Sequence, residues 1–437
     1  MCSNIKMYLL KNGFVVDPEN NLYGKMDILV GDDQKILEIG LNIEKGEIKN
    51  IYDLDNKVVF PGFIDMHVHL REPGREDKET IETGLKAALA GGFVGVGAMP
   101  NTNPVCDNRV IVDFVTSTAN KLQLANLHVI GAASKAEKGE ELACIGEMYE
   151  GGICAVSDDG LPITNSLLMR RIFEYIRKFD LTFISHSEDE FLSRDGVMNE
   201  GEYSIKLGMK GIPDETESIM VGRDILLCEM TKSKLHIAHV STEGSMILIE
   251  GAKSRGVDVT VEVTPHHFIL TDEEVEKQSY STNTKVNPPL RSAKNRDKML
   301  EYIKRGVIDM IVTDHAPHTK VDKSVEYDRA PFGMTGLETS VGLVVTYLIK
   351  KGVIDLNRMA EMMSINPRKR FKIDGGLKIG KLANISIVDM DKEWIVEKEN
   401  FYSKGKNTPF QGMKLVGKPY MTIVNGFVRM QDGNIIK

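Results

Sequence analysis

The sequence predicts an α/β fold in which a (β/α)8 TIM-like barrel carries a small composite β-sandwich domain formed by both termini. Eight short apolar segments alternate with amphipathic segments through the middle of the chain, which is typical of repeated βα units around a parallel sheet. The two ends of the chain instead contain short alternating segments with Asn-Gly and Asp-Gly turns, which indicate hairpins. No Gly-x-Gly-x-x-Gly turn follows a predicted strand, so an open doubly wound sheet fits less well.

The chain divides into two predicted domains, because 437 residues exceed the size that one hydrophobic core usually serves. Residues 1–61 and 376–437 have the same hairpin texture, and chain ends often lie close together at a domain surface. We therefore assign both ends, residues 1–61 and 376–437, to one small β-domain and residues 62–375 to the barrel.

The composition excludes several classes of function. A formal charge of −8 argues against a nucleic-acid or anionic-membrane surface. The five cysteines are odd in number and have no Cys-x-x-Cys spacing, so neither a disulfide framework nor a thiolate metal site is expected. No signal peptide and no membrane-spanning apolar run is recognisable, so we expect a cytoplasmic protein.

The predicted strands are short apolar runs between turn signals, and amphipathic stretches follow them. After the first strand, Ile81, Leu85 and Ala88 fall on one helical face, and Gly91-Gly92 ends that helix. The eight strands are expected at 63–70, 94–99, 128–133, 153–157, 181–185, 235–240, 257–263 and 310–313. Further helices are expected at 167–177, 297–305 and 337–349.

The first predicted strand carries two histidines on one face. Side chains of a strand alternate between its faces, so Asp65, His67 and His69 point the same way and Met66 and Val68 point the other way. Two imidazoles placed in this way can bind a single metal ion. A bare His-x-His pair is more often part of a core or a surface, so the rest of the chain has to decide.

The other histidines decide in favour of a metal centre. Nine of the ten histidines lie at or near the carboxyl end of a predicted strand, and only His128 lies at a beginning. Active sites of such barrels are built at the carboxyl ends of the strands, and scattered core histidines would not gather there.

Chemistry and strand parity select the ligands. Neutral imidazoles and carboxylates suit zinc. One residue of the pair Asp158-Asp159 is a candidate bridging carboxylate, and the other can cap a helix or orient the site. His236 and His315 have the opposite parity, so we interpret both as packing or supporting residues. The proposed ligands are His67, His69, His186, His239 and Asp314.

Seven runs of residues in order resemble the long, class I dihydroorotases of bacteria, a family of the amidohydrolase superfamily, and the resemblance extends to 403–409. The family implies a zinc-bearing barrel with a small β-domain built from both termini. The runs are DMHVHLREPG (65–74), AMPNT (98–102), SDDG (157–160), EVTPHH (262–267), NPPLR (287–291), TDHAPH (313–318) and RAPFGMTGLE (329–338).

The resemblance also implies roles for individual residues. Ser187 stands where the family often has cysteine, and the lid segment, residues 318–331, is about one residue shorter than in relatives. The implied zinc ligands are His67, His69, Asp159 as the bridge, His186, His239 and Asp314. The implied substrate contacts are His69, Arg71, Asn101, Asn287, His318 and the backbone of Phe332 and Gly333.

The resemblance implies reversible cyclisation of N-carbamoyl-L-aspartate to L-dihydroorotate in the de novo synthesis of pyrimidines (UMP). One or two zinc ions are expected, two being favoured, with Asp314 as the general acid and base. Arg71 suits the substrate carboxylate, although an ion pair with Glu72 or Glu76 is the alternative. A homo-oligomer, most simply a dimer, and association with an aspartate transcarbamoylase are further expectations.

Two other functions remain open at this stage. A hydantoinase or allantoinase would share the barrel, but the LREPG run (70–74) argues against them. Related amidohydrolase sites often use a carboxylated lysine on the fourth strand as the bridge between two metals, and this chain has an aspartate in its place. A non-catalytic scaffold that stabilises a transcarbamoylase could lose metal ligands, yet none is missing here.

Overall fold

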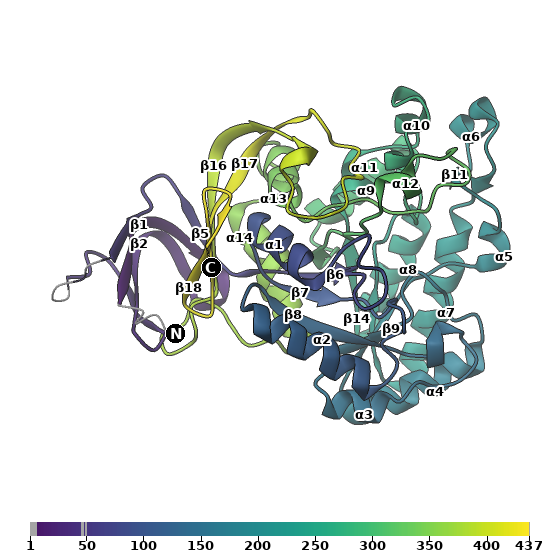
Figure 1. The fold of residues 1–437 in the computed structure, drawn as a ribbon. Helices are drawn as coiled ribbons and strands as arrows, with labels where there is room; N and C mark the ends of the chain where they lie inside the picture. Colours follow the sequence, from purple (N-terminus) through teal and green to yellow (C-terminus); the bar gives the residue numbers. More distant parts are fainter. Residues whose placement is uncertain (1–6, 45–47, 49, 437) are drawn as a thin grey trace.

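The structure, a computed structural model, describes residues 7–44, 48 and 50–436. The middle of the chain forms the predicted barrel, in which eight parallel strands each pair with the next one in chain order (Figure 1). A parallel bridge between Val68 and His315 nearly closes the barrel, and His69 N donates to His315 O over 2.9 Å. The strands are β6 (Phe63–Val68), β7 (Phe93–Ala98), β8 (Asn126–Ala132), β9 (Ala155–Ser157), β10 (Thr182–Ser185), β13 (Lys234–Ile237), β14 (Val259–Val263) and β15 (Met310–Ile311).

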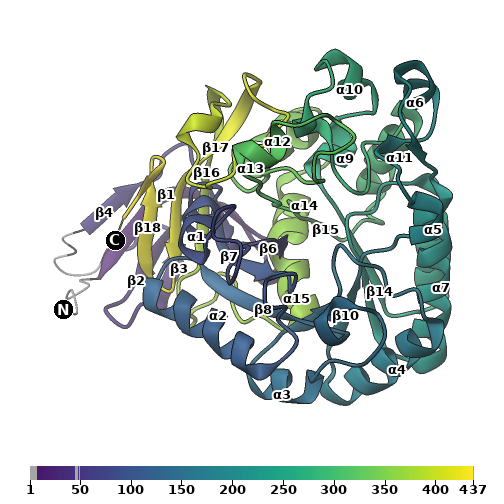
Figure 2. The same ribbon diagram turned by 45° about the vertical axis from the view of Figure 1, so that its right-hand side comes forward.

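Helices surround this barrel (Figure 2). The first of them begins where the Thr80 side chain accepts a hydrogen bond from Thr83 N, and it buries the predicted apolar face with Ile81 and Leu85. The longer helices are α1 (Ile81–Ala90), α2 (Arg109–Leu122), α4 (Ser166–Ile176), α7 (Glu215–Thr231), α8 (Glu243–Ser254) and α11 (Ala293–Lys304). The shorter ones are α3 (Ile145–Glu150), α13 (Ser340–Val344), α14 (Leu356–Ala360) and α15 (Asn366–Phe371).

Short elements interrupt the loops that connect the barrel units. The predicted helix at 337–349 is split, because α13 continues as a π-helical turn, η5 (Val345–Ile349). The remaining short helices are α5 (Glu190–Ser193), α6 (Glu202–Leu207), α9 (Pro265–Ile269), α10 (Glu273–Lys277) and α12 (Lys320–Lys323). The remaining turns and the two-stranded sheet are η1 (Pro18–Asn20), η2 (Lys135–Glu137), η3 (Arg177–Phe179), η4 (Thr282–Thr284), η6 (Glu361–Ile365), η7 (Lys398–Asn400), β11 (Met198–Asn199) and β12 (Gly211–Ile212).

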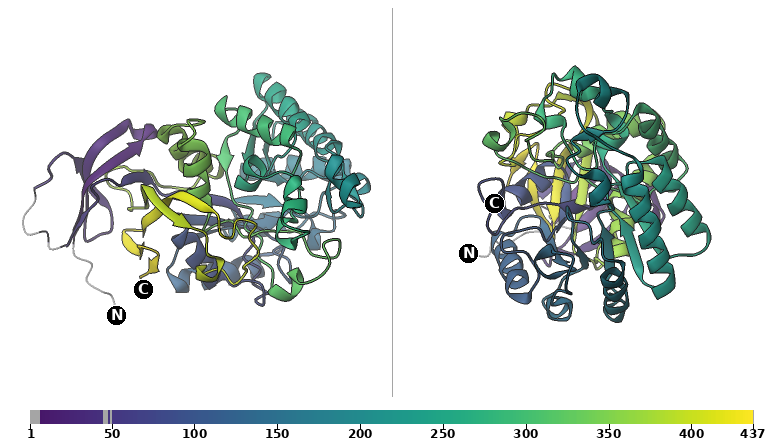
Figure 3. Two further views of the ribbon diagram at one scale, coloured as in Figure 1. Left: turned by 90° about the horizontal axis from the view of Figure 1, so that it is seen from above. Right: turned by 90° about the vertical axis from the view of Figure 1, so that its right-hand side faces the viewer.

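Strands from both ends of the chain form the predicted small β-domain, seen at one end of the molecule in Figure 3. They join into one nine-stranded mixed sheet through antiparallel pairing of residues 58–61 with residues 385–388. Residues of both parts share one core, for example Val15, Ile28, Ile385 and Ile423, so the two ends of the chain form one β-domain, built as a single mixed sheet. Its strands are β1 (Tyr8–Asp17), β2 (Leu22–Val30), β3 (Ile36–Gly40), β4 (Asn50–Asp53), β5 (Val58–Pro61), β16 (Ile385–Ile395), β17 (Lys414–Val424), β18 (Phe427–Gln431) and β19 (Asn434–Ile435).

The connection between β16 and β17 leaves the small sheet and packs on the barrel (Figure 1). Val396 and Phe410 share a buried cluster with Leu290 and Met334 of the barrel loops. The carboxyl-terminal part of the chain therefore reaches the same end of the barrel as the loops that follow the strands. The domain limits at residues 61 and 375 stay a prediction. None of the helices in the described part of the chain is long and apolar enough to cross a membrane.

Candidate metal centre and catalytic cavity

The six residues that we predict as metal ligands converge at the carboxyl ends of the barrel strands. Asp159 lies at the middle of the group, and its two carboxylate oxygens face different histidines. Oδ1 is 3.3 Å from His67 Nε2, 3.7 Å from His186 Nδ1 and 3.6 Å from His239 Nε2. Oδ2 is 3.4 Å from His69 Nε2. A carboxylate placed between two sets of imidazoles has the geometry of a bridging ligand.

Asp314 completes the group on the side of the first strand. Its Oδ1 lies 3.1 Å from His69 Nε2 and 3.5 Å from His67 Nε2. His67 therefore belongs to two candidate metal clusters, one with Asp159 and His239 and one with His69 and Asp314. All of these residues are buried.

The structure separates the two neighbouring aspartates, which strand parity left interchangeable and of which the family resemblance implied Asp159 as the bridge. Asp158 points away from the histidines, and its Oδ1 accepts hydrogen bonds from Ala133 N at 2.8 Å and Ser134 N at 3.0 Å. The alternative of a helix cap is wrong for Asp158, because Asn165 caps the following helix, α4. Asp158 braces the loop after the preceding strand, and Asp159 alone enters the cluster.

Three histidines of the cluster bond an oxygen through the ring nitrogen that points away from its centre. The ring nitrogen of each that points away from the cluster donates to an oxygen: His67 Nδ1 to Glu262 at 2.6 Å, His69 Nδ1 to Asn101 at 2.8 Å and His186 Nε2 to Glu188 at 3.0 Å. A neutral imidazole with that nitrogen protonated carries its lone pair on the other nitrogen, which is the form that binds a metal.

Glu262, Glu188 and Glu79 are the functional residues that our sequence analysis missed. Glu262 also accepts from His236 Nε2 at 2.9 Å, so His236 has the supporting place that its parity predicts. Burial favours the neutral form of Glu262, but His67 and His236 outweigh it and lower its pKa to about 2. Glu262 and Glu79 stand in or beside the quoted motifs at 262–267 and 65–74, which is the signal that could have found them.

His315 also lies outside the ligand cluster, as its parity predicts. Its Nε2 is 3.3 Å from Glu79 Oε2, and its Nδ1 accepts a hydrogen bond from Gly336 N. The residue thus links the barrel closure to the segment that follows the lid. Ser187 bonds the Ser185 hydroxyl at 3.0 Å and takes no part in the cluster.

A cavity of about 230 Å³ opens beside the cluster. Every residue predicted to touch substrate lines it. Arg71 is half-buried there with its Nε donating to Pro317 O at 3.3 Å, and burial lowers its pKa to about 10, which leaves it positively charged. The alternative ion pair is not observed, since Glu72 accepts from Ile81 N and Glu76 from Gly74 N. The predicted contacts that line the cavity are His69, Arg71, Asn101, Asn287, His318, Phe332 and Gly333.

The contacts of these residues show which groups remain available. His318 Nε2 donates to Phe332 O at 2.7 Å, and its Nδ1 accepts from Lys78 at 3.0 Å. Burial and the nearby Arg71 charge lower the pKa of His318 to about 2, so its ring is neutral. Asn287 Nδ2 donates to Glu188 at 2.8 Å, and Gly333 N donates to Lys285 O at 2.9 Å.

Three of the site residues have a left-handed backbone. The φ angles are 62° at Arg71, 31° at His239 and 48° at Asp314. Residues other than glycine rarely adopt this conformation, and such strain concentrates at functional sites. The left-handed conformation changes the direction of these three side chains at the points where the chain leaves its strands.

Comparison with known proteins places the chain in a family. A family model described as dihydro-orotase-like matches residues 56–245. The dihydroorotase of Acetivibrio thermocellus is 49% identical over 97% of this chain and 99% of its own length, and that of Pelotomaculum thermopropionicum is 50% identical over 97% and 98%. Among solved structures, the L-hydantoinase of Arthrobacter aurescens superposes with a TM-score of 0.89 at 26% identity, covering 99% of this chain and 98% of that one. The chain therefore belongs to the dihydroorotase family of the amidohydrolase superfamily.

Proposed function

We propose that the chain is a dihydroorotase, which cyclises N-carbamoyl-L-aspartate to L-dihydroorotate with loss of water, reversibly, in the de novo synthesis of UMP. The observation that carries this proposal is the joint lining of one cavity by five of the six candidate metal ligands and by Arg71. The near-full-length identity with dihydroorotases supports it.

The metal that best suits this cluster is zinc, with two ions per chain favoured over one. Four imidazoles and two carboxylates form the donor set of a catalytic zinc centre. His67 Nε2 and Asp159 Oδ1 are buried with no hydrogen-bond partner among the described residues, as expected of atoms that a metal would satisfy. One ion would be held by His67, His69, Asp159 and Asp314, and the other by Asp159, His186 and His239.

Zinc bound here would lower the pKa of water from 15.7 to about 7 and polarise the amide carbonyl of the substrate. Asp314 borders the cavity and would take the proton of the attacking water. In ring opening it would then pass this proton to the departing ring nitrogen, and in ring closure it would act in reverse.

The remaining cavity residues would hold the substrate. Arg71 offers paired N–H donors to the carboxylate. Asn101 uses its oxygen for His69, so its amide N–H groups are the ones that face a ligand. His318 and the backbone of Phe332 and Gly333 form the opposite wall, and Asn287 borders the side of His186.

The test is a substrate comparison with the purified, metal-loaded protein. We expect turnover of L-dihydroorotate to exceed that of hydantoin and allantoin by several orders of magnitude. Preference for hydantoin, the second candidate because of the likeness to the L-hydantoinase, would refute the proposal. Absence of both bound zinc and turnover would favour a non-catalytic scaffold.

We further propose a cytoplasmic location and a homo-oligomer, most simply a dimer. An aspartate transcarbamoylase is the protein partner that fits this activity. Size-exclusion chromatography with light scattering measures the oligomeric state of the chain alone and its association with that enzyme when the enzyme is added.

A further inference from the structure

A second cavity, of about 560 Å³, lies beside the catalytic cavity, and His318 lines both. Its walls come from residues 280–283, from the lid segment around α12 and from residues 398–407 of the carboxyl-terminal segment. It is more than twice as large as the catalytic cavity, and its volume is within the range of small-molecule sites. No role in the proposed reaction requires it.

The walls of this cavity carry a strong excess of positive charge. Five lysines and a single carboxylate, that of Glu399, line it. In the described part of the chain, none of the five lysines forms an ion pair with a carboxylate within 4.0 Å. The lysines are Lys320, Lys323, Lys398, Lys404 and Lys406.

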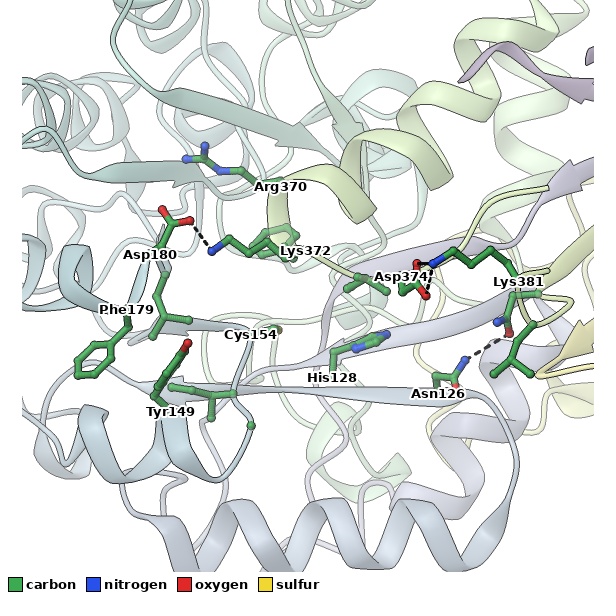
Figure 4. Close-up of a pocket in the computed structure, with 18 of the residues that line it drawn as sticks. Asn126, His128, Tyr149, Cys154, Phe179, Asp180, Arg370, Lys372, Asp374 and Lys381 are labelled. Atoms are coloured by element: carbon green, nitrogen blue, oxygen red, sulfur yellow. Dashed lines mark hydrogen bonds and ion pairs between the residues drawn. The ribbon is translucent and has the colours of Figure 1, made fainter. Parts of the chain in front are cut away.

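The cavity at the opposite ends of the barrel strands shows the ordinary pattern for comparison (Figure 4). There Lys372 pairs with Asp180, and Lys381 pairs with Asp374 at 2.7 Å. The lysines of that cavity have counter-charges within the protein. The five lysines of the lysine-lined cavity form no such ion pair among the described residues, although the volume of that cavity is similar, about 560 Å³ against about 520 Å³.

The ammonium groups of Lys323 and Lys406 donate hydrogen bonds to uncharged backbone carbonyls. Lys323 Nζ donates to Thr282 O at 3.0 Å and Pro331 O at 2.7 Å, and Lys406 Nζ donates to Ser403 O at 2.9 Å. Burial and the neighbouring lysines, Lys285 first, lower the pKa of Lys323 to about 7. A positive charge that is partly buried among like charges is costly, and an anion in the cavity would offset this cost.

We propose that this lysine-lined cavity binds a small ligand with at least two negative charges, either phosphate itself or a phosphate ester. Lys398 and Lys404 on one wall and Lys320 and Lys323 on the other supply the counter-charge. Because Lys323 holds the lid carbonyl of Pro331, the ligand also stabilises the lid segment.

Calorimetric titration of the full chain with inorganic phosphate, at constant ionic strength, tests this site. We expect saturable binding that the double substitution Lys398→Gln and Lys404→Gln weakens about tenfold or more, because two ammonium charges near the anion are lost. The substitution Lys378→Gln, at an exposed lysine outside the cavity, is the matched control and leaves binding unchanged. A parallel titration with ribose 5-phosphate identifies the source: tighter binding than phosphate indicates an ester, and equal binding indicates the free anion.

Two outcomes would overturn the site: no saturable binding in the millimolar range, or equal phosphate binding by the double variant and the wild type. The second would mean that the anion binds elsewhere on the chain. Thermal melting checks that the double variant is folded, and the two single variants replace it if it is not. The titration needs no turnover, so a protein that failed to convert dihydroorotate would leave its result unaffected.

Discussion

Glu262 orients two histidines through hydrogen bonds, although it lines neither cavity and does not contact the candidate bridge. Its carboxylate accepts from His67 Nδ1 and from His236 Nε2, which keeps the His67 lone pair on Nε2. An amide at this position would present an N–H group to one of these nitrogens and could accept from only one of them.

We therefore expect Glu262→Gln to weaken zinc binding about 10- to 100-fold, the usual effect of losing a partner that orients a metal-binding histidine. Competition with a zinc indicator measures the affinity. Glu190→Gln, at an exposed residue of α5, is the control and retains wild-type affinity. Unchanged zinc affinity in Glu262→Gln would show that the His67 tautomer does not depend on this carboxylate.

Asp314 carries the proposed proton transfer, and its backbone conformation places it against both His67 and His69. We expect Asp314→Asn to lower kcat for dihydroorotate about 10²- to 10⁴-fold, because the amide cannot accept the proton. Circular dichroism and the metal content of the variant separate this effect from unfolding or loss of zinc. A variant that retains its metal and stays within tenfold of wild-type kcat would exclude Asp314 as the base.

Strand parity explains in part why the sequence could predict which side chains reach the metal-ligand cluster. His67 and His69 lie within or directly after β6, where alternation is reliable, and both enter the cluster. His236 lies within β13 and takes the supporting place that parity gives it. His239 and Asp314 reach the cluster for another reason, because both follow the end of their strands and have left-handed backbones.

Alternation could not choose between Asp158 and Asp159, since β9 ends at Ser157. That choice depends on hydrogen bonds from the loop at 133–134, which is distant in sequence. The supporting glutamates were missed for a similar reason. Their partners, such as His67 for Glu262 and Ser403 for Glu79, are brought together only by closure of the barrel and by packing of the carboxyl-terminal segment.

Glu338 fastens that segment to the barrel, and its carboxylate accepts from Tyr402 N at 2.7 Å and Ser403 N at 3.2 Å. Burial raises its pKa to about 8. A carboxyl whose pKa is higher in the folded state loses stabilisation as pH rises from its unfolded value, near 4.5, through 8. Glu338→Gln lacks this titration. We therefore expect the free energy of unfolding of the variant minus that of the wild type to be larger at pH 8 than at pH 5, by about 1 to 3 kcal/mol. Urea unfolding at the two pH values measures this difference, and parallel pH profiles of both proteins would contradict it.

At the scale of the whole molecule, the catalytic cavity depends on a segment that both domains share. Residues 396–413 connect β16 to β17, two strands of the small sheet, yet they pack against the barrel loops. Asn407 of this segment bonds three residues that line the catalytic cavity. Its Oδ1 accepts from His318 N at 3.0 Å, and its Nδ2 donates to Ala316 O at 3.0 Å and Gly333 O at 3.1 Å. One side chain from the carboxyl-terminal part thus holds the residues at both ends of the lid segment, which form one wall of the catalytic cavity, here called the lid wall.

This arrangement predicts that Asn407→Ala impairs substrate binding from a distance in sequence. Loss of three buried hydrogen bonds leaves the lid wall unsupported, and we expect KM for dihydroorotate to rise about tenfold or more with a smaller change in kcat. Zinc content stays at the wild-type level, because Asn407 contacts none of the candidate ligands. Asn400→Ala, on the exposed turn η7 of the same segment, serves as the control and keeps the wild-type KM. An unchanged KM in Asn407→Ala would mean that the barrel loops form the cavity without the small domain, and that its carboxyl-terminal segment contributes only to stability.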